Sequence, residues 1–329
     1  EISACLVGSE MCIRDRFLAV TMTFLTAMML CTGCGSQETK QEQSTQTQTT
    51  NDIKEETGYK ESEVSYPEGQ VFCMGKEASG KPVAFLFDEK HTTQDNAAYK
   101  KYVFENDKWE ESDLSKTNEL LKKNKINMLY SLTEMADGKI FGIANKDTGI
   151  YLYALTDEFK AYPDAFGKKE IKNFQVVDAR RVLVMDGDGN VSLNDFKGKS
   201  IRQFGESNAF ADVVNDMVFT VDATGSKITV YDLSTGEKED EYEIQITQQG
   251  ICFAVNQDDE IYAATEKGIY LLENGKMTEV VPEKVMSTSA LSGEAWLNSL
   301  FVQGDKFYVS YVIEGDNSRE YRMTSYDKR

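Results

Sequence analysis

The pentapeptide Asp-Gly-Asp-Gly-Asn at positions 186–190 resembles part of a metal-binding loop. Its oxygen-bearing side chains alternate, as in the first half of a calcium loop. The second half does not follow, because Val191 stands where glycine is required and Lys197 where a bidentate acid is required. Asp, Gly and Asn also dominate β-turns, and the stretch separates two apolar runs. We therefore interpret it as a hairpin turn. The metal-ligand candidates that it contains are Asp186, Asp188 and Asn190.

Catalytic motifs are missing from the rest of the sequence. His91 is the single histidine, so a Ser-His-Asp or Cys-His arrangement would have to use it, and no nucleophile-elbow motif is present. The chain has no Walker-type loop, no GxGxxG motif before a helix and no Cys/His cluster with zinc-ligand spacing. Trp109 and Trp296 are interpreted as packing aromatics rather than ligand-stacking platforms. The sequence therefore predicts neither an enzyme nor a bound cofactor.

An apolar segment near the start of the sequence is followed by a cysteine with two small neighbours. Phe17 to Leu30 is uncharged and 14 residues long, which is too short for a membrane-spanning helix and typical of a signal peptide. Thr32, Gly33 and Cys34 follow it. These residues resemble the lipobox of bacterial lipoproteins, although Cys31 occupies the place where that family usually has leucine. The resemblance implies that Cys34 is diacylated and becomes the new amino terminus after cleavage.

The residues on either side of this segment complete the domain organisation. Residues 35–59 are rich in Gln, Thr and Glu, and such a composition cannot bury enough surface to fold, so we expect a flexible tether. Residues 1–16 resemble translated sequencing adapter, and we expect them to be non-native. The expected divisions are non-native sequence at 1–16, a lipoprotein signal segment at 17–33, a lipidated cysteine with its tether at 34–62, and a folded domain at 63–329.

A weak internal repeat runs through the folded part. Five segments begin with a polar turn and continue with β-branched or aromatic residues, and their anchors lie 36 to 46 residues apart. These anchors are Ile140, Val182, Val218, Ile261 and Phe307. A second short strand follows each anchor after a Gly, Asn or Asp turn, which indicates hairpins. The stretch at 228–237 resembles the inner hairpin of YVTN-like, quinoprotein-like and WD40-like propellers.

Four short strands in about 42 residues are typical of one blade of a β-propeller. We therefore predict an all-β fold, a propeller of four-stranded blades, with a β-sandwich array as the alternative. Six blades are visible, and the first is irregular because a long polar loop at 88–100 separates its strands at 81–87 and 102–104. The last blade stops after its third strand, so we expect a truncated chain and seven or eight blades in the full protein. One short helix is expected at Ser115 to Asn124.

The net charge and the cysteine positions give two further expectations. The net charge of −19 repels a phosphate backbone, so we expect no nucleic acid partner. Cys73 and Cys252 lie in apolar strand-like runs, and we expect both to be buried free thiols rather than a disulfide.

Three functions remain open. The first is a non-enzymatic scaffold, anchored by lipid on the extracytoplasmic side of the membrane, that binds an unknown protein or small molecule. The lipobox, polar segment and irregular propeller also resemble the amino-terminal region of large lipoproteins from clostridial bacteria. In some of those a solute receptor follows the propeller and serves an ABC transporter permease, which implies import as the second function. The third is a propeller enzyme of the lactonase, lyase or quinoprotein kind, which the single histidine disfavours.

Overall fold

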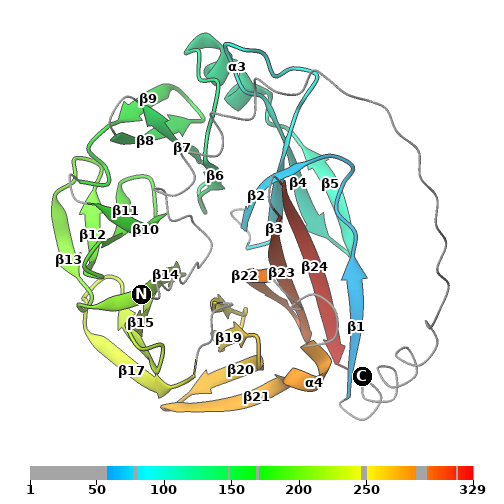
Figure 1. Ribbon diagram of the computed structural model, residues 1–329, viewed down its shortest axis with the longest axis vertical. Coiled ribbons are helices and arrows are strands. Elements are labelled where there is room, and N and C mark those ends of the chain that lie inside the picture. The colour runs from blue at the N-terminus through cyan, green and yellow to red at the C-terminus, as the bar shows by residue number, and fades with distance from the viewer. Residues whose placement is uncertain are drawn as a thin grey trace, which may run out of the picture.

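In the computed structural model, the described residues are 58–76, 80–146, 149–167, 170–245, 250–286, 295–315 and 318–328. They form six four-stranded antiparallel sheets, arranged as the blades of a ring (Figure 1). This confirms the predicted β-propeller and excludes the β-sandwich array. Two helices, α3 (Ser115–Lys123) and α4 (Glu283–Met286), lie in connections between blades. Among the described residues, no helix has the length and apolar character needed to cross a membrane.

Within blades 1 to 5, four consecutive strands pair in chain order from the inside of the ring outwards (Figure 1). Blade 1 contains β2 (Val71–Lys76), β3 (Pro82–Phe87), β4 (Tyr99–Glu105) and β5 (Lys108–Ser112), and blade 2 contains β6 (Ser131–Glu134), β7 (Ile140–Lys146), β8 (Gly149–Leu155) and β9 (Phe159–Tyr162). Blade 3 contains β10 (Ile171–Val176), β11 (Arg181–Asp186), β12 (Val191–Asp195) and β13 (Ser200–Gln203), and blade 4 contains β14 (Asn208–Val214), β15 (Met217–Asp222), β16 (Lys227–Asp232) and β17 (Lys238–Glu243). Blade 5 contains β18 (Cys252–Val255), β19 (Ile261–Thr265), β20 (Gly268–Glu273) and β21 (Lys276–Pro282), and blade 6 contains β22 (Ala295–Gln303), β23 (Lys306–Gly315), β24 (Ser318–Lys328) and β1 (Tyr59–Val64).

Blade 6 closes the ring with strands from both ends of the described chain. Its order is β22-β23-β24-β1, so the first strand of the fold lies outermost beside the last (Figure 1). β1 pairs antiparallel with β24, from Tyr59 opposite Lys328 to Val64 opposite Met323. The expectation of seven or eight blades is therefore wrong: the ring has six, because β1 supplies the fourth strand of the last blade. This strand begins at Tyr59, four residues before the domain start expected at 63.

The repeat anchors occupy equivalent places in their blades. All five lie in the second strand of a blade, and the strand that follows each of them is the third. Cys73 and Cys252 lie on the innermost strands of blades 1 and 5, where both are buried and neither is part of a disulfide, as expected. The hairpins that the sequence indicates are therefore the middle pair of strands in each sheet.

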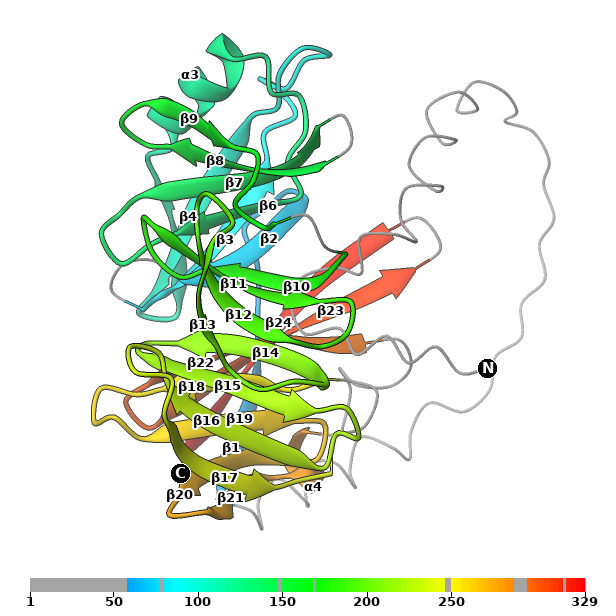
Figure 2. The same ribbon diagram turned by 90° about the vertical axis from the view of Figure 1, so that its left-hand side faces the viewer.

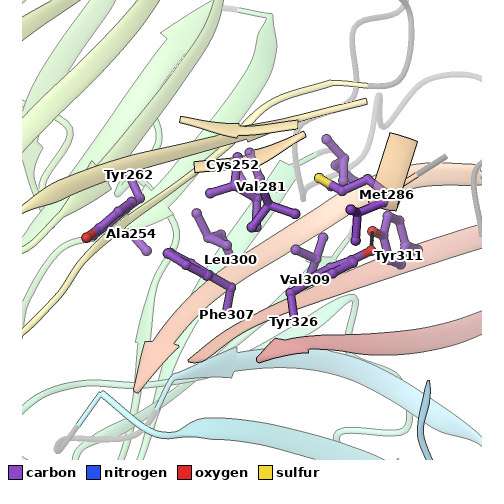
Figure 3. Packing of buried hydrophobic residues seen from close by; sticks show 14 of the residues in the cluster. Cys252, Ala254, Tyr262, Val281, Met286, Leu300, Phe307, Val309, Tyr311 and Tyr326 are labelled. Atoms are coloured by element: carbon purple, nitrogen blue, oxygen red, sulfur yellow. Dashed lines mark hydrogen bonds between the residues drawn. The ribbon is translucent and has the colours of Figure 1, made fainter. Parts of the chain in front are cut away.

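Six hydrophobic clusters, one at each junction between neighbouring blades, make up the core. Each cluster draws side chains from two facing sheets, because alternate residues of a strand point to opposite faces. Figure 3 shows the junction of blades 5 and 6, where the Tyr262 and Phe307 rings meet edge to face at 5.1 Å. In the same cluster the hydroxyl groups of Tyr311 and Tyr326 lie 3.1 Å apart. The ring is therefore held together blade by blade rather than by one central core.

Candidate functional site

Two irregular segments of blade 1 enclose a cleft. The first is the β3–β4 loop at 88–98, and the second is the connection between β5 and β6, which contains α3. Together with the adjoining ends of β4 and β5 they surround a cavity of about 700 Å³. Its lining includes Asp88, His91, Lys100, Glu111, Asn118 and Lys122. The only histidine of the chain is thus part of this cleft.

Hydrogen bonds within the 88–98 loop hold its shape. The Asp88 carboxylate accepts the backbone N–H of Lys90 at 3.2 Å, and its other oxygen lies 2.7 Å from Nδ1 of His91. The Thr92 hydroxyl oxygen accepts the N–H of Ala98 at 3.1 Å, which ties the two ends of the loop together. A polar loop with these internal bonds can form a defined wall without a hydrophobic core of its own.

The helix α3 is docked on neighbouring strands. Asn118 accepts the N–H of Tyr99 at 3.0 Å and donates its side-chain amide to the carbonyl of the same residue at 2.8 Å. The Thr117 hydroxyl donates to the Leu155 carbonyl of blade 2 at 2.8 Å, and Leu121 is fully buried. The predicted helix is confirmed, and its contacts make it a fixed second wall of the cleft.

Charges of both signs line the cleft. They come from Lys90, Lys100, Lys122, Asp88, Glu111, Asp113 and Glu119. Burial of Asp88 opposes its ionisation, but the hydrogen bond and charge of His91, together with the charge of Lys100, outweigh this and lower the pKa of Asp88. Asp88 is therefore an anion that orients the His91 ring, whose side chain is 76% exposed. Such a lining suits a polar, charged ligand better than an apolar one.

The candidate metal ligands at 186–190 form a turn between β11 and β12. One oxygen of Asp186 accepts the backbone N–H of Asp188 at 3.1 Å and that of Asn190 at 3.0 Å. The side-chain amide of Asn190 donates to the same carboxylate at 3.0 Å. The hairpin interpretation is confirmed. Within the described part of the chain, no group of three or more His, Cys, Asp or Glu side chains is arranged to hold a metal ion.

The lipidation candidate and the two tryptophans complete the sequence-predicted residues. Cys34 lies outside the described residues, as does the whole of 1–57. Trp109 packs against Tyr66 and Phe104 with ring centroids 5.5 and 4.9 Å away, and it belongs to the junction of blades 6 and 1. Trp296 lies on β22 opposite Val312 of β23. Trp109 therefore acts as a packing aromatic, as the sequence predicts.

Two groups of ionisable residues, one between neighbouring blades and one on innermost strands, are not predicted from the sequence. Lys101 of β4 and Glu134 of β6 form an ion pair at 2.5 Å between blades 1 and 2, with side chains 7% and 9% exposed. Lys76, Asp212 and Cys252, on the innermost strands of blades 1, 4 and 5, act on one another's ionisation. The only signal in the sequence is a charged residue within an apolar run, and it does not show which residues meet.

Comparisons with known proteins identify no family. No protein-family model matches the chain, and no curated protein sequence matches it. Among solved structures, the chain is similar to Hsv2 from Kluyveromyces lactis, with 8% identity, coverage of 79% of this chain and 99% of that chain, and a TM-score of 0.45. It is also similar to virginiamycin B lyase from Staphylococcus aureus, with 12% identity, coverage of 82% and 98%, and a TM-score of 0.43. The WD40 β-propeller domain of Doa1 is 11% identical, with coverage of 82% and 97% and a TM-score of 0.43. At these values the assignment of a six-bladed propeller rests on the strand pairing of this chain itself.

Proposed function

We propose that this protein is a lipid-anchored extracytoplasmic lipoprotein whose propeller is a non-enzymatic binding scaffold. The main support for a binding role is the cleft on blade 1. It is a cavity of about 700 Å³ with walls fixed by hydrogen bonds, built where the chain departs from the regular blade. Binding residues of proteins concentrate on loops that a rigid framework positions, and blade 1 has this arrangement. The ligand is a polar molecule or protein segment that complements a lining of mixed charge.

The position of the cleft suits a scaffold anchored through the residues before β1. Figures 1 and 2 place α3 at one end of the molecule's long axis and the start of β1 near the other end. The proposed anchor at Cys34 precedes Tyr59, so the chain joins the ring far from the cleft. A partner that approaches from outside the membrane then reaches the cleft without passing the anchor.

Cysteine labelling in intact cells tests both parts of this proposal. Glu119 lines the cleft and is exposed, and Lys197 is an exposed residue in the β12–β13 turn, far from the cleft in the sequence and on another blade. We expect a membrane-impermeant maleimide to label both E119C and K197C in intact cells, with the unsubstituted chain as the background control. We further expect the in-cell rate of E119C, relative to that of the purified protein, to fall at least fivefold below the same ratio for K197C.

Two results would contradict the proposal in different ways. Labelling of K197C only after lysis would place the propeller on the cytoplasmic side and remove the extracytoplasmic location. Equal ratios for E119C and K197C would show that nothing occupies the cleft in cells, and the scaffold proposal would then be wrong for this cleft.

A further inference from the structure

The acidic side chains that line the cleft on blade 1 are mostly engaged by groups of the protein itself. Asp88 lies 2.7 Å from Nδ1 of His91, and Asp113 accepts the backbone N–H of Ser115 at 3.0 Å. Glu111 accepts the hydroxyl of the tyrosine opposite it on β4 at 3.5 Å. Three of the four carboxylates in the lining therefore already have a partner within the protein.

The basic side chains of the same lining have no such partners. Lys90 lies on the β3–β4 loop, Lys100 on β4 and Lys122 on α3, so each comes from a different element around the cavity. None of the three ammonium groups makes a hydrogen bond or ion pair with another residue of the described ranges. Each ammonium has three N–H donors. The cleft therefore offers unused, positively charged donors from three of the elements that enclose it.

The size and lining of the cleft restrict its ligand further. A cavity of about 700 Å³ suits a small molecule, since pockets for such ligands measure about 300–1,000 Å³. Ala98, Tyr99 and Leu114 are buried members of the lining and give it an apolar part. A compact anion reaches only the donors around one point, whereas acidic groups spaced along a carbon framework reach donors on separate elements.

We propose that the cleft binds a small polycarboxylate, an organic acid with two or three carboxylate groups. Its carboxylates accept hydrogen bonds from the ammonium groups of Lys90, Lys100 and Lys122, and its carbon framework lies against the apolar part of the lining. Complementary charge of this kind gives specificity for the ligand and speeds its association. The inference rests on the function proposed for the cleft and names the class of ligand.

The test is calorimetric titration of the purified full-length protein in detergent, with succinate and citrate as probes. We expect saturable binding of at least one of them. Monomethyl succinate keeps the framework and loses one charge, so it should bind at least tenfold more weakly than succinate. Inorganic phosphate should also bind at least tenfold more weakly than the better probe, because it is compact. The diamine 1,4-diaminobutane has a similar length and the opposite charge, and it should not bind.

Matched variants locate the site. We expect K100M and K122M each to weaken binding of the better probe at least fivefold. K108M and K123M are the controls, because Lys108 on β5 and Lys123 on α3 are exposed and do not belong to the lining, and both should bind as the unsubstituted chain does. E119Q should bind at least as tightly as the unsubstituted chain, because it removes a negative charge from the lining.

Four results would overturn the proposal: no saturable binding of succinate or citrate, equal binding of monomethyl succinate and succinate, tighter binding of phosphate than of either probe, or unchanged binding by K100M and K122M. Circular dichroism establishes that each variant is folded. The comparison among probes uses only the unsubstituted chain, so it decides the matter even where a variant fails to fold.

The labelling of E119C in intact cells separates this inference from the function on which it rests. Slowed labelling in cells without polycarboxylate binding in the calorimeter would leave the scaffold function and overturn the ligand class alone. Equal labelling ratios for E119C and K197C in cells, together with polycarboxylate binding by the purified protein, would leave the binding site and contradict the occupancy that the scaffold function requires.

Discussion

Asp212 differs from the other described carboxylates whose ionisation is shifted. The pKa values of Asp88, Asp107, Asp222 and Asp240 are lowered, because hydrogen bonds and nearby charges favour their anions. The pKa of Asp212 is raised to about 6, chiefly by burial, and Lys76, the Val213 N–H and Gln175 offset only part of this. A carboxylate that is harder to ionise in the folded state than in the unfolded state lowers the stability of the fold at neutral pH.

Replacing Asp212 with asparagine should therefore stabilise the protein at high pH. In the folded protein the carboxyl pKa is about 6, against 3.8 for its ordinary value, so the unfolded state loses this proton first as the pH rises. The cost grows between these two values and is complete above the higher one, where it amounts to about 2–3 kcal/mol. We expect D212N to exceed the unsubstituted chain in unfolding free energy by about this amount at pH 8 and by only about 0.5 kcal/mol at pH 4.

Urea unfolding at the two pH values measures this difference. D216N serves as the control, because Asp216 is exposed and its replacement should leave the pH dependence unchanged. A stability gain of D212N that is equal at pH 4 and pH 8 would show that the effect is not ionic. A loss of stability at pH 8 would show that the carboxylate contributes more to the fold as an anion than burial costs.

Many of the acidic residues stabilise turns by accepting hydrogen bonds from backbone N–H groups. Asp195 accepts the N–H groups of Lys197 and Lys199, each at 2.9 Å, and Asp222 accepts that of Ser226 at 2.7 Å. The same pattern in Asp186 explains why its turn imitates the start of a calcium loop. A short carboxylate that bonds the next backbone N–H groups favours a tight turn whether or not a metal is present.

At the scale of the elements, neighbouring blades are joined by polar ties as well as by the hydrophobic clusters. Asn173 on β10 donates to the Ala211 carbonyl of β14 at 2.9 Å, and Gln175, two residues further on, clamps Val213. Residues two apart on a strand share a face, so the two amides form a ladder from blade 3 to blade 4. The ladder satisfies backbone groups on inner strands, where an unpaired carbonyl would cost about 1–3 kcal/mol.

The strand that closes the ring is held mainly by its pairing. In β1 only Tyr59 is buried, at 7% exposure, and the other five residues are partly or fully exposed. Ser62 lies directly opposite Ser325, whose hydroxyl donates to the Ser62 carbonyl at 3.4 Å. A covalent bond at this pair should therefore stabilise the closed ring.

We expect the oxidised S62C/S325C variant to unfold at higher denaturant concentration than its reduced form, by about 2–4 kcal/mol of unfolding free energy, because the bond restricts the unfolded chain. The two positions are 263 residues apart, so the loop that the bond closes spans nearly the whole propeller. The single variants S62C and S325C should show no difference between oxidising and reducing conditions. Failure of the pair to oxidise in the folded protein would contradict the pairing of β1 with β24.

The sequence predicts the regular elements well and the long-range contacts poorly, for a physical reason. The anchors such as Val218 and Ile261 lie on buried strands whose alternation is visible in the chain. β1 reads YKESEV, an exposed edge strand with little apolar alternation, so nothing local marks it as the closing strand. The cleft needs a polar loop and a helix whose hydrogen bonds cannot be read from composition.

At the scale of the whole molecule, β1 begins near one end of the long axis, and α3, whose residues line the cleft, lies at the other end (Figure 2). Among the described residues, the six hydrophobic clusters each join one blade to its neighbour, so the ring is held by six separate junctions.

The last prediction concerns the proposed lipid anchor, which attaches the whole molecule to the membrane. Two acyl chains on one cysteine hold a protein at a membrane firmly, since each buried methylene contributes about 0.8 kcal/mol. We expect the unsubstituted chain to incorporate radiolabelled palmitate and to sediment with membranes, and C34A to do neither. C31A is the matched control and should keep both properties, because the lipobox resemblance assigns the lipid to Cys34. The propeller of C34A should keep its circular dichroism spectrum, because the first described strand begins at Tyr59. Palmitate on C34A, or its loss from C31A, would show that the lipobox is misassigned.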